Sequence, residues 1–588
     1  MTLEREPRSA RRIDVALDLW VLVSVVFLAW PLLVRRGYPF SRDLVFTPAL
    51  PLRPEAFGLG TGSPRAAPLD AVVALASTVL DGAVVGRLAV LGVLALAGWG
   101  AHRALKGLGV PARAAVAALA VWNPFVVERL GLGQWALLGA YAALFWLVRA
   151  LTDQGRGPRE RQARAAPRLL LGALTPTGAL LVGVTTVLVG VRRRGDAGLV
   201  CLAAAVQLPW LVPAVLSAAG AASAVSDPAA VTAFSARAER PGPALFSLVG
   251  LGGIWDAQSV PGTREGWLGL ATPALVVVAL LVAWRSAARP ATLGRRVWVL
   301  GLGSLVVSAV TTVGVAAEVV ASLTDLVPGL GLLRDAQKWL APFVVLSALA
   351  VGVLVDRVLR STRRRAPVAV QALVVLAVTL PFVLLPDGAV VVHRVVQPVS
   401  YPRDFADVAA VLDRESGRAP GALASAPWRL YRAYPWATPY ATYDPSSRWF
   451  DVRVLTSDDL TVGGTILHGE DPWAARVGAV LESPDATTVR VLGREGVRWL
   501  LVHREDPDAA ALLDTVSGDP SVTRVVDGPS LVLIRFDHTA TEVAEAAAPP
   551  AWQLVLVAGV DLAVLALLLA VTLRRTSRSR TDRSVTLA

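Results

Sequence analysis

An acidic and a basic residue follow the first apolar segment of the chain, at a depth where ionisable side chains are costly and usually functional. Arg42 and Asp43 lie in the segment 38–44. A carboxylate here can act as a general base toward a hydroxyl group, and the arginines of the same loop favour an anionic, lipid-linked substrate. The alternative is structural: Arg42 neutralises Asp43, and the other arginines belong to a long loop that crosses the membrane whatever its charge.

A second group of polar residues surrounds a glycine turn at 131–133, between two apolar segments. Glu128 and Arg129 precede the turn, Gln134 follows it, and Pro124 leaves one backbone carbonyl without its usual donor. We expect these three side chains to converge on the outer rim of the membrane and to bind substrate there. The alternative is that Glu128 and Arg129 pair with each other and extend to water.

A third group, Arg334, Asp335 and Lys338, precedes a later apolar segment. If a helix starts near Asp335, Arg334 and Lys338 lie four residues apart and share a face. Two cations beside the free N–H groups of a helix start favour a phosphate. The alternative is that Asp335 caps the helix while the cations anchor it at the interface, although cations oppose the helix dipole at this end.

The chain around these groups is far more apolar than an ordinary soluble domain. Of its 588 residues, 54% are hydrophobic, and the mean hydropathy is +0.55, which indicates a membrane protein. The net charge of +12 does not indicate nucleic-acid binding, because the basic residues flank apolar segments and contact lipid headgroups there. Cys201 is the single cysteine, so no internal disulfide can form.

Arginine tracts alternate along the chain and predict its orientation, because short basic loops stay in the cytoplasm. They lie at 5–12, 156–168, 192–194, 363–365 and 574–583. Both termini are therefore expected inside the plasma membrane and the polar block 387–548 outside. Ten spans near the ~20 residues of a membrane helix are expected, at 15–34, 83–101, 113–128, 134–150, 197–218, 268–284, 297–320, 339–358, 367–386 and 551–573.

The expected fold class is a polytopic α-helical membrane protein of about 10–12 helices with an extracytoplasmic α/β domain near the C-terminus. Its expected parts are a multi-span core at 1–386 with a long first outer loop at 35–82, the α/β domain at 387–548, and a last helix with a basic tail at 549–588. Arginines flank both ends of 169–191 and Pro176 interrupts it, so a hairpin of two short helices is preferred to one span.

Within the outer block, periodicity predicts both helices and strands. A buried strand is expected at 496–502, and a hairpin around Asp527, Gly528 and Pro529. Helical spacing is found at 402–414, 473–483 and 507–516. The stretch 428–449 is rich in Trp and Tyr, which either stack on sugar rings or pack the block onto the membrane core.

This plan resembles the glycosyltransferase-C superfamily of polyprenyl-phosphate-sugar-dependent enzymes. More narrowly, the Arg-Asp-x-x-Lys loop at 334–338 and the Gly-Val-Arg-Trp-Leu-Leu-Val strand at 496–502 are similar to bacterial YfhO-like and actinobacterial arabinosyl- or mannosyltransferase-like membrane proteins. The resemblance implies that Asp43 is the acid of the first outer loop and that Arg334 and Lys338 bind the lipid phosphate. Many relatives carry paired acids in that loop, whereas Asp43 has Arg42 beside it, so a divalent cation is neither required nor excluded.

The resemblance implies an inverting transfer of a sugar from a polyprenyl-phosphate donor to an envelope glycan or lipid acceptor on the outer face. Asp43 would be catalytic, with membrane lipids as surroundings, no nucleic-acid partner and no certain cofactor. Substrate would contact Arg42, Glu128, Arg129, Gln134, Arg334, Asp335 and Lys338. A transporter or flippase of lipid-linked sugars is the main alternative, and a non-catalytic envelope assembly protein is the other. A transporter favours charged or broken helices near the bilayer midplane, and in the sequence only Pro176 predicts such a break.

Overall fold

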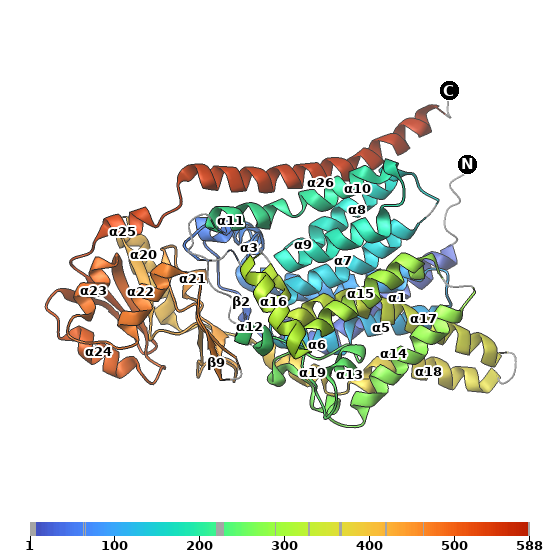
Figure 1. The fold of residues 1–588 in the computed structure, drawn as a ribbon, viewed down its shortest axis with the longest axis horizontal. Coiled ribbons are helices and arrows are strands. Elements are labelled where there is room, and N and C mark those ends of the chain that lie inside the picture. Colours follow the sequence, from blue (N-terminus) through green and yellow to red (C-terminus); the bar gives the residue numbers. More distant parts are fainter. Residues whose placement is uncertain are drawn as a thin grey trace.

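The computed structural model describes residues 8–585, except for 63, 65, 154, 219–227, 288–289, 327–329, 364–366, 418–419 and 463. The described chain is mostly helical, with a smaller block of strands and helices at one end of a helical bundle (Figure 1). Arg5, and the 364–365 part of another arginine tract, lie outside the described residues.

Tightly packed helices rich in alanine and glycine form the centre of the bundle. Small side chains let the helix backbones approach each other closely. A Cβ on Gly98, for example, would lie 2.7 Å from Cγ1 of Val21 on the neighbouring helix. The central helices are α1 (Arg8–Ala29), α4 (Gly82–Ala104), α5 (Val110–Val121), α6 (Pro124–Gly131) and α7 (Trp135–Thr152).

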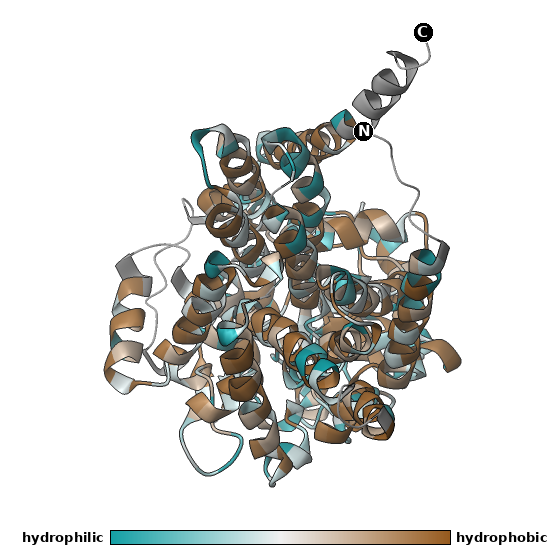
Figure 2. Cartoon of the chain, turned by 90° about the vertical axis from the view of Figure 1, so that its right-hand side faces the viewer, coloured by the Kyte–Doolittle hydropathy of each residue, from teal (hydrophilic) through white to brown (hydrophobic). Residues whose placement is uncertain are grey.

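Further apolar helices surround this centre, and hydrophobic ribbon predominates among the helices of the bundle (Figure 2). α26 begins beside the C-terminal block and runs along the bundle to the end where α1 begins (Figure 1). The surrounding helices are α10 (Ala197–Ala205), α11 (Leu208–Ala218), α14 (Leu268–Arg285), α15 (Arg295–Val310), α16 (Gly314–Leu326), α17 (Ala341–Arg363), α18 (Pro367–Leu384), α19 (Gly388–Val395) and α26 (Ala551–Val585).

The segment around Pro176 folds as two helices, as the sequence predicted. α8 (Pro158–Gly172) and α9 (Pro176–Thr185, followed by a π-helical turn, η2, at Thr186–Gly190) are separated by a short break. Thr175 caps α9, because its hydroxyl accepts a hydrogen bond from the Gly178 N–H at 3.1 Å. The first helix begins earlier than the predicted boundary at 169.

Within the described residues, six helices are long and apolar enough to cross a membrane, or nine if each of three bent pairs is one span. The chain is therefore a polytopic membrane protein, with fewer spans than the ten to twelve helices expected. Charge accounts for part of the difference, because every 18-residue stretch of α1 contains the three charged residues Arg12, Asp14 and Asp18. α9 with its π-helical turn (Pro176–Gly190) is too short.

Bent pairs were not foreseen, since only Pro176 was expected to interrupt a span. α10 and α11 meet at 47°, α15 and α16 at 94°, and α18 and α19 at 52°. At the first of these breaks Gln207 restores hydrogen bonding, because its side-chain amide donates to the backbone oxygens of Ala179 and Ala203, each at 2.9 Å.

The C-terminal block contains a five-stranded sheet in the order β11-β12-β10-β4-β7, with β4 parallel to both β10 and β7. Its helices and strands lie close to the positions predicted from periodicity, and the 527–529 turn joins β11 to β12. The elements are α20 (Arg403–Glu415), β4 (Ala422–Ala426), β7 (Val454–Leu455), α22 (Pro472–Leu481), α23 (Thr488–Arg494), β10 (Val497–His503), α24 (Ala509–Ser517), β11 (Val522–Asp527) and β12 (Leu531–Phe536).

The long loop at 35–82 is joined directly to this block. In a small sheet of order β2-β1-β3, the loop strand β1 (Tyr38–Ser41) is the middle strand. It pairs with the loop strand β2 (Leu44–Val45) on one side and with β3 (Pro398–Val399) on the other. Arg448 also donates to Asp70 at 2.9 Å. Independent folding of 387–548 stays a prediction, and these contacts mean that the isolated segment would lose a strand partner.

Orientation in the membrane also stays a prediction, and reporter fusions test it. We expect a periplasmic-type phosphatase to be active when fused near residue 470 and inactive near residues 160 and 580, because arginine tracts flank the latter two. A cytoplasmic reporter at the same positions should give the opposite pattern. Phosphatase activity at 160 would contradict the predicted orientation.

Candidate functional site

The turn between β1 and β2 places Arg42 and Asp43 against the glycine turn that follows α6. The Asp43 N–H donates to the Leu132 oxygen at 3.1 Å. Gly133 has a φ of +85°, and a Cβ there would lie 2.4 Å from the Leu44 nitrogen, so this close approach requires glycine. Arg42 has a φ of +53°, an uncommon backbone conformation for a residue with a side chain. Two of the predicted groups are thereby brought together.

Asp43 is half-buried and accepts two side-chain hydrogen bonds. Gln134 Nε2 donates to Oδ2 at 3.2 Å, and the Tyr431 hydroxyl donates to Oδ1 at 2.6 Å. Within the described part of the chain no cation forms an ion pair with this carboxylate. Asp43 is therefore oriented by two neutral donors and remains partly exposed.

Arg42 does not neutralise Asp43, so that interpretation is wrong. Its Nη1 lies 2.5 Å from Asp256 Oδ2, its Nη2 donates to Gln258 Oε1 at 2.9 Å, and the guanidinium stacks 4.2 Å from the ring centre of Tyr440. The left-handed backbone at Arg42 turns its side chain toward another loop, because adjacent side chains need not point the same way in a tight turn.

Arg129 is fully buried and pairs with Asp335, not with Glu128. Its Nη1 and Nη2 donate to the two Asp335 oxygens at 2.8 and 2.9 Å. Nη1 also donates to Gln134 Oε1 at 2.8 Å, and Nε to Gln337 Oε1 at 2.7 Å. The alternative interpretation, in which Glu128 and Arg129 pair with each other, is wrong because consecutive residues on a helix face different directions.

Glu128 belongs to a buried network on the other side of Gln337. Its Oε2 accepts from the Ile254 N–H at 3.1 Å and from Gln337 Nε2 at 3.4 Å. The neighbouring pair, Glu239 and Arg264, is 2.7 Å apart and also buried. Glu128 therefore holds the segment near residue 254 in place, and it is not exposed to substrate.

Asp335 does not cap a helix with its side chain, so the alternative interpretation of this group is wrong for Asp335. It accepts from Arg129 and lies 3.3 Å from Lys338 Nζ. Burial raises the pKa of Asp335, but the two cations outweigh this effect and lower the pKa to about 2. The carboxylate is therefore charged at neutral pH, and Lys338 is already partly neutralised by it.

Arg334 and Lys338 were expected to share a face of an α-helix, but the segment is a 3₁₀-helix (Ala336–Leu340) that precedes α17. Arg334 lies in a bend before this helix, so it does not share a helix face with Lys338. Lys338 turns to Asp335, while the Arg334 guanidinium lies 5.1 Å from the ring centre of Phe234. Both cations remain half-exposed.

A cavity of about 570 Å³ opens beside these residues. Asp256 and Gln258, the partners of Arg42, form part of its wall, and the strands β8 (Leu460–Val462) and β9 (Thr465–Leu467) form another part. Phe234, whose ring contacts the Arg334 guanidinium, packs against both strands. The lining residues are Thr232, Ala233, Arg237, Trp255, Asp256, Ala257, Gln258, Val462 and Thr465.

The structure thus connects most of the predicted site in one hydrogen-bonded path. It runs through Tyr431, Asp43, Gln134, Arg129, Asp335 and Lys338. Tyr431, Gln337, Asp256 and Gln258 belong to this site but were not named as site residues from the sequence. Their signals were present, since Tyr431 lies in the aromatic stretch and Gln337 in the Arg-Asp-x-x-Lys loop.

A second polar cluster lies inside the C-terminal block. The Ser425 hydroxyl donates to Asp444 at 2.6 Å and lies 3.1 Å from His503 Nε2. Arg432 and His503 hold the pKa of Asp444 below its ordinary value despite its burial, while burial and Arg432 lower the pKa of His503 to about 3. All of these side chains are buried, so the cluster fixes the block internally and is no site for a substrate.

Among the described residues, no three His, Cys, Asp or Glu side chains are grouped as metal ligands. Asp256 in the cavity wall and Asp43 in the adjacent loop are each held by hydrogen-bond donors of the protein. The path and the cavity bring together one partly exposed carboxylate, half-exposed cations and a space for a polar ligand.

The fold is similar to that of arabinofuranosyltransferase AftD from mycobacteria, with a TM-score of 0.57 and 17% identity over 90% of this chain and 40% of that one. A variant of the same enzyme gives a TM-score of 0.54 and 17% identity, over 89% and 41% of the two chains. The chain therefore spans about two fifths of the length of AftD. No protein-family model and no curated protein matches the sequence. At this identity the similarity concerns the fold alone.

Proposed function

We propose that the chain is a membrane glycosyltransferase that transfers a sugar from a polyprenyl-phosphate donor to an envelope glycan or lipid on the outer face. The observation that carries this proposal is the half-buried carboxylate of Asp43, which is partly exposed and hydrogen-bonded by Tyr431 and Gln134. The fold shared with AftD, whose name is that of a glycosyltransferase, supports it.

Asp43 would act as the general base in an inverting displacement. The acceptor hydroxyl gives its proton to Asp43, its oxygen forms a bond to the anomeric carbon, and the bond from that carbon to the phosphate oxygen breaks. The departing phosphate keeps the electron pair. Tyr431 and Gln134 donate to the carboxylate and fix its orientation toward an acceptor hydroxyl. The neighbouring Arg42 connects this turn to Asp256 and Gln258 in the cavity wall.

Arg334 and Lys338 would stabilise the charge on the departing phosphate. Both are half-exposed, and Arg334 contacts Phe234 at the edge of the cavity. Cations placed where negative charge develops are effective because they need no rearrangement during the reaction. Arg42 has a different role in this proposal, because it fixes Asp256 and Gln258 as part of the cavity wall.

Transfer by purified protein in liposomes tests the proposed function directly. We would offer a panel of polyprenyl-phosphate sugars that includes arabinofuranose, because the name of AftD contains that sugar, with envelope glycan fragments as acceptors. Radiolabel should pass from donor to acceptor, and polyprenyl phosphate should be released in equal amount. Labelled lipid that crosses the bilayer without any cleavage would contradict the proposal.

Replacing Arg334 by Ala tests the donor site. The loss of a charge-assisted bond to phosphate costs ~1.5–3 kcal/mol, so donor affinity should fall by roughly ten- to a hundredfold with little change for the acceptor. Arg334→Lys should recover part of the loss if the contact is bidentate. Arg36→Ala is the matched control, since it removes another exposed arginine of the outer loop. Equal losses for donor and acceptor would mean that Arg334 anchors the helix only.

A transporter or flippase of lipid-linked sugars is the second candidate, and the bent helices favour it. The break between α10 and α11 lies in the middle of the predicted span 197–218, and discontinuous helices near the midplane are typical of transporters. Asp43→Asn distinguishes the two functions. It should leave lipid movement across the bilayer unchanged if the chain is a transporter, and it should stop release of polyprenyl phosphate if the chain is a transferase.

A further inference from the structure

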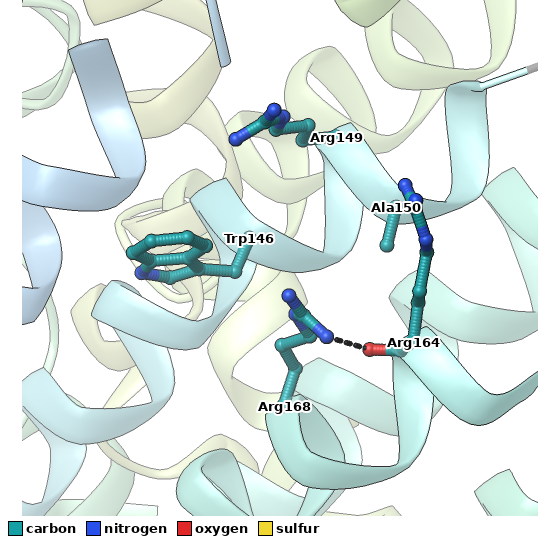
Figure 3. Close-up of a pocket in the computed structure, with 5 residues that line it drawn as sticks. All are labelled: Trp146, Arg149, Ala150, Arg164 and Arg168. Carbon is teal, nitrogen blue, oxygen red and sulfur yellow. Dashed lines mark hydrogen bonds between the residues drawn. The ribbon is translucent and has the colours of Figure 1, made fainter. Parts of the chain in front are cut away.

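A second cavity lies at the opposite end of the bundle from Asp43, between the last turns of α7 and the helix α8. Its volume is about 200 Å³, and Trp146, Arg149, Ala150, Arg164 and Arg168 line it. We call it the arginine pocket. In Figure 3, Arg149 extends from α7 while Arg164 and Arg168 extend from α8 toward α7. Three of its five lining side chains are cations and none is acidic.

The charge of the pocket is only partly balanced by the protein. Arg164 lies 3.4 Å from Asp153 and 3.3 Å from Glu160, and Arg168 donates to the Arg164 backbone oxygen. For Arg149, in contrast, the described residues provide no hydrogen bond and no ion pair, although its side chain is half-buried. A half-buried guanidinium in this setting is stabilised by an added anion.

A fourth arginine contacts the tryptophan that lines the pocket. Trp146 carries two guanidinium groups on its ring, that of Arg168 at 5.8 Å and that of Arg103 from α4 at 5.6 Å. Arg103 is itself paired with Asp18 at 2.7 Å. The tryptophan therefore holds two arginines beside the pocket.

We propose that the arginine pocket binds the phosphate group of an anionic ligand at the membrane surface. Arginine presents a planar fork of N–H donors that matches phosphate oxygens, and two helices supply such forks from opposite walls. The volume is below that of pockets for drug-sized ligands, so a single phosphate group fits and a sugar chain does not. Basic pockets between membrane helices near the surface bind lipid headgroups, and a free phosphate has the same chemistry.

The full-length protein in lipid nanodiscs allows a test with two arms. In the first, nanodiscs of phosphatidylcholine with and without phosphatidylglycerol are compared, and lipid that stays bound is counted by native mass spectrometry. In the second, inorganic phosphate is titrated into nanodiscs of phosphatidylcholine alone, and the shift in melting temperature is measured. Retention of phosphatidylglycerol identifies a lipid headgroup, and a saturable shift with phosphate identifies a soluble phosphate ligand.

Arg149→Gln should weaken binding of phosphatidylglycerol or of inorganic phosphate, whichever of the two the wild-type protein binds, by roughly tenfold or more, because one charge-assisted hydrogen bond is lost. Arg149→Lys should restore part of it. Arg159→Gln is the control, since it removes an exposed arginine of the same helix α8 outside the pocket and should change nothing. If Arg149→Gln fails to fold, Arg168→Gln replaces it. Equal losses in pocket and control variants, or no response in either arm, would overturn the proposal.

Discussion

Asp43→Asn is expected to abolish sugar transfer while the protein still inserts and purifies normally. Asparagine keeps the shape and can still accept the hydrogen bond that Tyr431 donates at 2.6 Å, although its NH2 group then faces Gln134 Nε2, a second donor, and the bond at 3.2 Å is lost. It cannot take a proton from the acceptor hydroxyl, and loss of a general base costs ~10²–10⁴-fold in rate. The measurement is initial rate of transfer at saturating donor, with folding checked by size-exclusion chromatography.

Glu55→Gln is the matched control for this variant. Glu55 lies in the same outer loop, is exposed, and pairs with Arg53 at 3.3 Å, away from the cavity. The same change from carboxylate to amide there should leave the rate within a factor of about two, since exposed ion pairs contribute little. Transfer by Asp43→Asn at the wild-type rate would remove Asp43 from the role of base.

Asp335→Asn is expected to destabilise the protein by about 3–5 kcal/mol, because it leaves Arg129 buried without a counter-charge. Arg129 is fully buried and is held by Asp335 at two positions. The pKa of Asp335 is lowered to about 2 from an ordinary 3.8, so its ionised form stabilises the fold. This stabilisation is fully present above pH ~4 and is lost as the pH falls toward ~2. Reversible unfolding in mixed micelles at pH 7 and pH 3 measures it.

Glu415→Gln is the control for the buried pair. Glu415 and Arg535 lie 2.9 Å apart, which is close to the distance between Arg129 and Asp335, but about a third of each side chain is exposed. Solvent screens such a pair, so its loss should cost no more than ~1 kcal/mol. The difference in the free energy of unfolding between wild type and Asp335→Asn should also be smaller at pH 3 than at pH 7. An equal difference at both pH values would mean that the variant loses packing and not charge.

Local periodicity was sufficient to predict the helices, the break at Pro176 and the sheet elements of the C-terminal block, because these depend on neighbours in the chain. The strand β10 and the hairpin β11–β12 follow from alternation and turn residues within 496–536. Bends such as that between α15 and α16 were missed. Gly314, at the start of α16, is the only local sign of that break, and a glycine inside an apolar run is common.

Side-chain partners could not be predicted, because they are distant in sequence. Arg42 pairs with Asp256, 214 residues away, and Arg129 with Asp335, 206 residues away. In each case a neighbour of opposite charge, Asp43 or Glu128, suggested a pair that the backbone direction forbids. The residue types were informative about chemistry, but only the packing of loops determined which carboxylate stayed partly exposed.

The join between the first outer loop and the C-terminal block also governs when the site can form during synthesis. Asp43 and Tyr431 are separated by 388 residues, and the strand partner of β1 is β3 at Pro398–Val399. At a synthesis rate of about 5–20 residues per second, roughly 20 to 80 s pass between the synthesis of Asp43 and the synthesis of Tyr431. Throughout that interval the loop carries an unpaired strand edge on its side of the membrane.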